Sequence, residues 1–384
     1  MSKLKKVLVI ASYGDSLINF RGELLKDLCS KSCQVIACAP NLSHKVIKFL
    51  KSLSIEDYDL PLDRTGFNPI KDLRTIAHIM RLIVIKKPDM ILAYTVKPNI
   101  FTGIALSILR RCTKTGKKTK FFPLITGIGS IFLQERNTNL LKNALYKCII
   151  LFYRASLSNA KKVIFQNKDD QKLFLKLGIV DSRKRCEHVA GSGVNLKWFR
   201  PHLLPQKQRF LMVARLLGHK GVREYAQAAE IVRKKIPGTV FQLAGGWDEN
   251  PSSISKNELV RWKTNKTIVY LGELRDVRPA LKKCRYFVLP SYREGLPRSV
   301  LEAMATGRPI LTTDVPGCRD TVHSGKNGYK VFPQSSEALA DKMIMLVKHS
   351  EKKIKKMAQT SLALARKKYD VRLVNAQLVK IFRG

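Results

Sequence analysis

Negative charge is scarce in this sequence. Its 384 residues include 29 Asp and Glu against 71 Lys and Arg, a formal net charge of +42. A balance this basic predicts an anionic partner, either nucleic acid, an acidic membrane surface or a phosphorylated substrate. With 45% hydrophobic and 26% charged residues, the composition is nevertheless globular, which excludes a wholly disordered chain.

Metal-binding and redox spacings of cysteine are absent. None of the eight cysteines forms a C-x-x-C pair, and no histidine stands at zinc-finger spacing from them. We therefore expect reduced, partly buried thiols in a cytosolic protein.

A long hydrophobic run is absent as well. The run at 7–11 is too short for the core of a signal peptide. Lys147 and Arg154 interrupt the stretch 144–153 well short of the roughly 20 apolar residues that span a bilayer. We expect a cytoplasmic protein with a peripheral contact on the inner face of the plasma membrane.

Short apolar runs alternate instead with helical patterns. A run at 7–11, a turn at 12–16, a helical pattern at 17–29 and a second run at 35–39 make a βαβ unit. Buried strands separated by helices predict a parallel sheet covered on both faces. Further strands are expected at 90–93, 121–125 and 163–165, and, after a polar linker at 199–208, at 209–214, 240–244, 268–271, 286–290 and 309–312.

This alternation predicts an α/β fold of two doubly wound, Rossmann-like domains that face each other across a cleft. The first would cover residues 1–200 and the second 201–384, with the last helix able to pack back on the first domain. Ligands of such sheets bind beyond the carboxyl ends of the strands.

The most informative stretch is SYREGLPRSVLEAMATGRP at 291–309. It places Glu294 in a loop after a strand, and Glu302 about one turn inside a helix for which Pro297 suits the first position. The N–H groups of residues 296–299 would attract a phosphate, and two carboxylates beside it suit hydroxyl-rich ligands such as ribose and a hexose. The alternative, two charges favoured by the helix dipole, explains Glu302 poorly, since it lies beyond the first turn.

At this point the sequence resembles a known family. The spacing Glu294-x7-Glu302 resembles the E-x7-E signature of family 4 of the GT-B glycosyltransferases, which are retaining enzymes. Other stretches follow in the order of that family: GSGVN (191–195), VARLLGHKG (213–221), FQLAGG (241–246) and VYLGEL (269–274). Stretches similar to the branch that extends polyprenyl-diphosphate-linked glycans for O-antigen, capsule or protein glycosylation are NFRGELLKDL (19–28), TVKP (95–98), TGIGSIF (126–132) and FQNKDD (165–170).

The resemblance implies a role for each residue of the donor site. Arg215 and Lys220 would hold the diphosphate and stabilise the charge that grows on it as the glycosidic bond breaks. Glu302 would hold the ribose hydroxyls, and Glu294 would lie beside the donor sugar. For Arg215 and Lys220 the alternative is a solvated loop in a lysine-rich chain. The other donor-site residues are Gly14, Gly245, Leu274, Gly295, Leu296, Pro297 and Ser299.

Two features give no support to other chemistry. The adjacent Asp169 and Asp170 better suit a helix start than a metal site, so we expect two cations in place of a metal, and no cofactor. The first glycine loop, around Gly14, would face the donor, although a plain βα turn is nearly as good an interpretation. It is not G-x-G-x-x-G and gives no support to a dinucleotide site.

The residues that the resemblance assigns to the acceptor are Asn19, Arg21, Lys97 and Thr126. Many members of the family carry a histidine after the strand at 121–125. Here a Thr-Gly pair stands in that region, and neither residue is a general base. This departure is compatible with a front-face mechanism, in which the leaving phosphate takes the acceptor proton.

Positive charge is densest between residues 91 and 168, where 14 basic residues occur with a single acidic one, Glu135. On an acidic bilayer each nearby Lys or Arg contributes on the order of 1 kcal/mol. The segment 140–157 mixes aromatic, aliphatic and basic positions as an interfacial helix does. We therefore expect an anionic membrane surface as a partner of Lys114, Lys117 and Lys118; a solubilising charge pattern is the alternative.

Together these features predict a retaining glycosyltransferase. By family analogy it would move an N-acetylhexosamine from a UDP-sugar to a polyprenyl-diphosphate-linked glycan at the cytoplasmic membrane face. Transfer to a soluble acceptor is one alternative. A nucleic-acid-binding protein is another, but no RRM, KH or helix-turn-helix signature accompanies the charge, so no nucleic-acid partner is expected.

Overall fold

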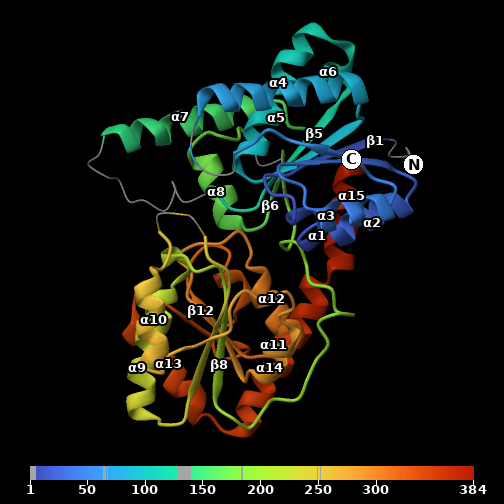
Figure 1. The fold of residues 1–384 in the computed structure, drawn as a ribbon. Helices are drawn as coiled ribbons and strands as arrows, with labels where there is room; N and C mark the ends of the chain where they lie inside the picture. The colour runs from blue at the N-terminus through green and yellow to red at the C-terminus, as the bar shows by residue number, and fades with distance from the viewer. Residues whose placement is uncertain are drawn as a thin grey trace. The chain divides into compact units, whose positions relative to one another are not determined.

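The chain folds into two compact units, each built on its own parallel sheet (Figure 1). The computed structural model describes residues 6–63, 66, 68–128, 140–182, 185–248, 250 and 252–384. One unit comprises residues 1–192 together with 374–384, and the other comprises residues 193–373. All eight cysteines are free thiols.

The first unit contains a seven-stranded sheet of order β3-β2-β1-β4-β5-β6-β7. Every neighbouring pair of strands is parallel. The central strand β4 is buried along its whole length, because apolar cores lie on both faces of the sheet. The strands are β1 (Lys6–Ile10), β2 (Gln34–Ala39), β3 (Glu56–Asp59), β4 (Met90–Tyr94), β5 (Lys120–Ile125), β6 (Val163–Phe165) and β7 (Cys186–His188).

Helices connect these strands. The helical pattern at 17–29 is divided in two at Arg21, which turns into the core with 3% of its surface exposed and its guanidinium 5.1 Å from the centre of the Tyr94 ring. The helix that connects β3 to β4 is capped by Asn68, whose side chain accepts a hydrogen bond from the Lys71 N–H at 3.2 Å. The helices are α1 (Ser16–Asn19), α2 (Gly22–Ser30), α3 (His44–Ser52), α4 (Pro69–Lys86), α5 (Val96–Cys112), α6 (Lys114–Lys118), α7 (Leu140–Leu157) and α8 (Lys168–Lys176).

The second unit repeats the design with a six-stranded parallel sheet of order β10-β9-β8-β11-β12-β13. Its strands are β8 (Arg209–Val213), β9 (Val240–Ala244), β10 (Val269–Tyr270), β11 (Tyr286–Leu289), β12 (Ile310–Thr313) and β13 (Gly328–Val331). Its helices are α9 (Val222–Lys235), α10 (Lys256–Thr264), α11 (Arg278–Lys283), α12 (Arg298–Ala305), α13 (Ser336–Lys348) and α14 (Glu351–Leu364).

The polar stretch at 199–208 belongs to the second unit. Arg285 Nη1 donates to the carbonyl oxygen of Pro205 at 2.5 Å, and Arg308 Nη1 donates to that of Leu203 at 3.1 Å. Both arginines are almost completely buried, so their guanidinium groups hold this stretch against the unit. The chain passes from one unit to the other earlier, at residues 192–193.

The last helix, α15 (Val371–Arg383), returns to the first unit. Its apolar residues join the core under β4 and β5, where the rings of Phe382 and Phe122 meet edge to face with centres 5.2 Å apart. Asn375 Nδ2 also donates to Asp27 Oδ2 at 2.7 Å. The end of the chain thus completes the unit in which the chain begins.

Candidate active site

The E-x7-E residues lie at the carboxyl edge of the second sheet. The loop after β8 carries Arg215 and Lys220, the loop after β9 begins at Gly245, and the loop after β11 carries Glu294. A Cβ on Gly245 would fall 1.7 Å from the carbonyl oxygen of Ala214, so only glycine lets the first two loops approach this closely. This edge is where parallel α/β sheets bind their ligands.

Glu294 and Lys220 form one ion pair at this edge. Lys220 Nζ lies 2.6 Å from Glu294 Oε1, and the same oxygen accepts a hydrogen bond from Ser291 Oγ at 2.7 Å. Only 16% of the lysine side chain and 14% of the glutamate side chain are exposed. The backbone N–H of Glu294 donates to the carbonyl oxygen of Pro316 at 3.1 Å, which fixes its loop to the one after β12.

Arg215 forms a second ion pair, with Asp248. Asp248 follows β9 and is largely buried, and it also accepts a hydrogen bond from the Asn250 N–H at 3.1 Å. The arginine side chain is more exposed. Asp248 has no place in the sequence prediction, because a contact between loops 33 residues apart leaves no periodic signal in the sequence.

Glu302 forms a third pair, with Arg298. Arg298 Nε lies 2.8 Å from Glu302 Oε1, four residues along α12. Glu302 is 8% exposed. Burial raises the pKa of its carboxyl group, Arg298 opposes that rise, and Asp276 adds to it. The i,i+4 spacing is a signal by which Arg298 could have been found in the sequence.

The remaining donor-site residues surround these pairs. α12 begins at Arg298, so Pro297 stands just before the helix rather than in its first position. In the first turn of α12, the N–H of Val300 donates a hydrogen bond to the carbonyl oxygen of Pro297 at 3.1 Å. Gly295 and Leu296 are in this same β11–α12 connection, and Ser299 is the second residue of α12. Leu274 follows β10 at the same edge of the sheet, whereas Gly14 follows β1 in the first unit. The role of Gly14 stays a prediction.

The predicted acceptor residues share the carboxyl edge of the first sheet. Asn19 and Arg21 follow β1, Lys97 follows β4, and Thr126 follows β5. Lys97 is held by Asp72, with Nζ 2.8 Å from Oδ1. The TGIGSIF stretch beyond Ile128, and Glu135, lie outside the described residues.

The structure separates the predicted membrane lysines from the acceptor residues. Lys114, Lys117 and Lys118 are exposed on α6, which leads into the amino end of β5, whereas Thr126 follows its carboxyl end. A strand of this length measures about 20 Å, so the two groups occupy opposite edges of one sheet. Exposed apolar residues lie elsewhere, on α7, where Leu151 and Phe152 are 58% and 43% exposed.

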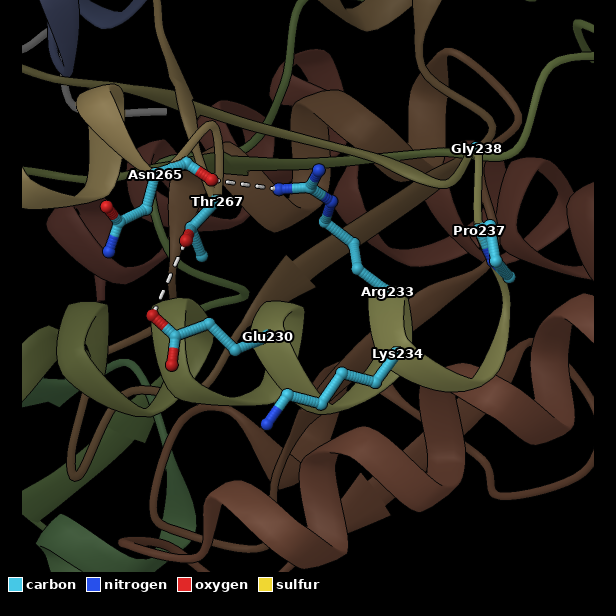
Figure 2. A pocket seen from close by; sticks show the side chains of 7 residues that line it. All are labelled: Glu230, Arg233, Lys234, Pro237, Gly238, Asn265 and Thr267. Carbon is cyan, nitrogen blue, oxygen red and sulfur yellow. Dashed lines mark hydrogen bonds between the residues drawn. The ribbon is translucent and has the colours of Figure 1, made fainter.

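A cavity of about 430 Å³ lies apart from all these residues, at the amino edge of the second sheet (Figure 2). Arg233 Nη1 donates across it to the carbonyl oxygen of Asn265 at 3.4 Å, and Thr267 Oγ1 donates to Glu230 Oε1 at 3.4 Å. These polar groups of the cavity therefore form hydrogen bonds with one another. Its lining residues are Glu230, Arg233, Lys234, Pro237, Gly238, Asn265 and Thr267.

Two features are absent from the described part of the chain. No three histidine, cysteine or acidic side chains gather there in a way that could hold a metal ion. No described helix combines the length and the apolar character needed to cross a membrane.

Both halves of the chain match family models. Residues 6–167 match the one described as Glycosyl transferase 4-like, and residues 207–349 match the one described as Glycosyl transferases group 1. The N,N'-diacetylbacillosaminyl-diphospho-undecaprenol alpha-1,3-N-acetylgalactosaminyltransferase of Campylobacter jejuni is 27% identical over 96% of either chain. The UDP-Gal:alpha-D-GlcNAc-diphosphoundecaprenol alpha-1,3-galactosyltransferase of Escherichia coli is 24% identical over 72% of this chain and 71% of its own.

Solved structures share the fold. Sucrose-phosphate synthase from Thermosynechococcus elongatus has a TM-score of 0.78 at 18% identity, over 99% of this chain and 98% of that one. HepE from Anabaena, in complex with UDP, has a TM-score of 0.75 at 17% identity, over 98% and 99%. The solved structures confirm the predicted fold, and the family models confirm the resemblance that the E-x7-E stretch suggested.

Proposed function

Because this chain is a glycosyltransferase of the GT-B fold, we propose that it moves a sugar from a nucleotide donor to a polyprenyl-diphosphate-linked glycan, with retention of the anomeric configuration. The proposed donor is a UDP-sugar carrying an N-acetylhexosamine. The printed names of the Campylobacter jejuni and Escherichia coli relatives both specify a diphospho-undecaprenol-linked acceptor, and the second names a UDP-sugar, which supports this substrate class.

The observation that carries the proposal is the pair formed by Lys220 and Glu294 beside the start of α12. A donor diphosphate bound here would replace Glu294 as the partner of Lys220 and Asp248 as the partner of Arg215. Fixed cations stabilise the charge that grows on the diphosphate as the bond to the anomeric carbon breaks. Glu294, released from Lys220, would then accept hydrogen bonds from the sugar hydroxyls.

The proposed transfer needs no side-chain base. The acceptor hydroxyl attacks the anomeric carbon on the face from which the diphosphate leaves, and its proton passes to the departing phosphate oxygen. Thr126 follows β5, in the region where many members of the family carry a histidine. The hydroxyl group of Thr126 is not a general base. The proton therefore leaves with the nucleotide.

We also propose that the first unit contacts an anionic membrane surface at the cytoplasmic face, where a polyprenyl-linked acceptor resides. The exposed lysines of α6 and the exposed Leu151 and Phe152 of α7 support this contact. Acceptor residues at the carboxyl edge of the same sheet would then receive the glycan.

A nucleotide screen tests the donor assignment. The melting temperature is measured with UDP, GDP and ADP. A ligand at 100 times its Kd stabilises the folded chain by about 2.7 kcal/mol, so a nucleotide that binds should raise the melting temperature. UDP should give the largest rise, because the proposed donor is a UDP-sugar. Glu302→Gln should reduce that rise. If no nucleotide raised the melting temperature, the donor site would be wrongly assigned. NMR of the product anomer, with a UDP-sugar and a polyprenyl-diphosphate glycan, then tests retention.

A further inference from the structure

His219 belongs to the same loop as the two cations of the proposed diphosphate site, next to Lys220 and four residues after Arg215. It belongs to the short turn Gly218–Lys220 that connects β8 to α9. Its carbonyl oxygen accepts a hydrogen bond from the Tyr292 N–H at 2.9 Å, which ties the turn to the β11–α12 connection. Its ring Nδ1 lies 3.4 Å from Ser252 Oγ. The ring is partly buried, the backbone of His219 is fixed by Tyr292, and Nδ1 lies beside Ser252.

Four charged side chains are close enough to influence this ring. Burial lowers the pKa of the His219 imidazole, and Lys220 and Arg215 lower it further, while Glu294 and Asp248 oppose them. These four residues are the members of the two ion pairs described above. Before an anionic ligand binds, this balance favours the neutral ring.

A bound diphosphate reverses this balance. It brings at least two negative charges to the two cations, and a nearby negative charge favours the protonated imidazole. We propose that His219 takes up a proton from solvent when a nucleoside diphosphate binds, and so becomes a third, pH-dependent cation of the site. The proton returns to solvent when the nucleotide leaves. This inference rests on the proposed function, since it needs a diphosphate at Arg215 and Lys220.

The consequence is an affinity for the nucleotide that depends on pH. Uptake of one full proton makes the affinity change about tenfold per pH unit, and partial uptake makes it change less. Affinity should rise as pH falls, because the protonated ring binds the anion. The nucleotide itself also titrates, since a terminal phosphate has a second pKa near 6. That contribution is the same for every protein variant and cancels in a comparison.

The test is calorimetric titration with UDP in buffers of different ionisation enthalpy at pH 6.5 and 7.5, which counts the protons taken up. The wild type is compared with His219→Gln and with His202→Gln. His202 is a matched control, because burial also lowers its pKa but it faces Lys282 and Arg308 at the other edge of the sheet. We expect the wild type and His202→Gln to take up the same number of protons, and His219→Gln about 0.3 or more fewer per UDP bound.

Equal proton uptake by the wild type and His219→Gln, with UDP bound by both, would overturn this inference and leave the proposed function standing. Absence of binding of UDP, GDP and ADP to the wild type would overturn both. If His219→Gln does not fold, the ring C–H signals of His219 in the wild type answer the question. Their midpoint of titration should move to higher pH when UDP is added, and an unchanged midpoint contradicts the proposal.

Discussion

At the scale of the residue, each cation of the candidate site already has a carboxylate of the same chain as its partner. Lys220 is paired with Glu294, and Arg215 with Asp248. Such pairs hold long side chains in place before a ligand arrives, at the cost that the ligand must displace the carboxylates. The family resemblance identifies the cations because both belong to one motif, VARLLGHKG at 213–221. The resemblance does not identify Asp248, which the fold brings in from another loop.

We predict that Arg215→Ala and Lys220→Ala each reduce turnover by roughly 100-fold or more, because a lost contact to transition-state charge is worth a few kcal/mol. Folding should change little. Lys235→Ala, at the amino edge of the same unit, is the control and should keep wild-type turnover. Steady-state kinetics with donor and acceptor measures this. Wild-type rates in both site variants would remove Arg215 and Lys220 from the reaction.

Glu302 should show the stability cost of a functional carboxylate. Its pKa is raised in the folded chain by burial, so the folded state holds the proton more tightly than the unfolded state does. The ionised form therefore destabilises the folded chain above this raised pKa, and the cost disappears below the unfolded value. Glu302→Gln should melt at a higher temperature than the wild type at pH 8, with the difference gone near pH 4. A variant that melts lower at pH 8 contradicts this.

At the scale of the element, the apolar strands could be predicted and the polar edge strands could not. Continuous apolar runs mark β1, β4, β5 and β11 because both faces of these strands are buried. β3, with the sequence EDYD, and β7, with CEH, are edge strands that carry no such run. β13, at the edge of the second sheet, also begins at a glycine. Their pairing comes from the neighbouring strand rather than from their own residues.

The start of α12 underlies a prediction about metal. Its backbone N–H groups, with Arg215 and Lys220, would neutralise the diphosphate that a metal ion neutralises in other transferases. Turnover in excess EDTA should therefore stay within about twofold of turnover without it. Assays with added Mg²⁺ or Mn²⁺ are the comparison. Complete loss in EDTA, restored by either ion, would show that the cations of this chain do not suffice.

The contact of α5 with α7 depends on one glycine. A Cβ on Gly103 would fall 2.4 Å from the carbonyl oxygen of Ser156. Gly103→Ala should lower the free energy of unfolding by about 1–3 kcal/mol, the usual cost of overpacking. Gly22→Ala in α2 is the matched helical control, since its Cβ would meet Phe49 at an ordinary 3.4 Å. Denaturant unfolding measures both, and equal stabilities of the two variants would contradict the close packing of α5 on α7.

At the scale of the whole molecule, a formal charge of +42 is spread over both units, so local arrangement decides what it does. On the first unit the α6 lysines lie at one edge of the sheet and the acceptor residues at the other. Replacing Lys114, Lys117 and Lys118 by Glu should weaken binding to vesicles of anionic lipid and activity on a lipid-linked acceptor. Hydrolysis of the free UDP-sugar should change little, because the ion pairs of the proposed donor site all lie in the second unit.

Co-sedimentation with anionic and with neutral vesicles, with and without salt, measures the membrane binding of the wild type and of the triple lysine variant. Salt should release part of the bound protein, because it limits surface charge to a reach of about 8 Å. Leu151→Asp with Phe152→Asp tests the apolar contribution of α7 separately, since both side chains are exposed and the core should tolerate their loss. Equal binding to both vesicle types, or unchanged binding of the triple variant, would leave the α6 lysines without this role.

The return of α15 to the first unit also governs the order in which the protein can be made. Residues 374–384 supply Leu378 and Phe382 to the core beside Leu92 and Phe122. While the ribosome is still adding the second unit, that core is open to water on one side. The unit that is synthesised first is therefore completed last, and a nascent chain must protect this apolar surface until its final helix emerges.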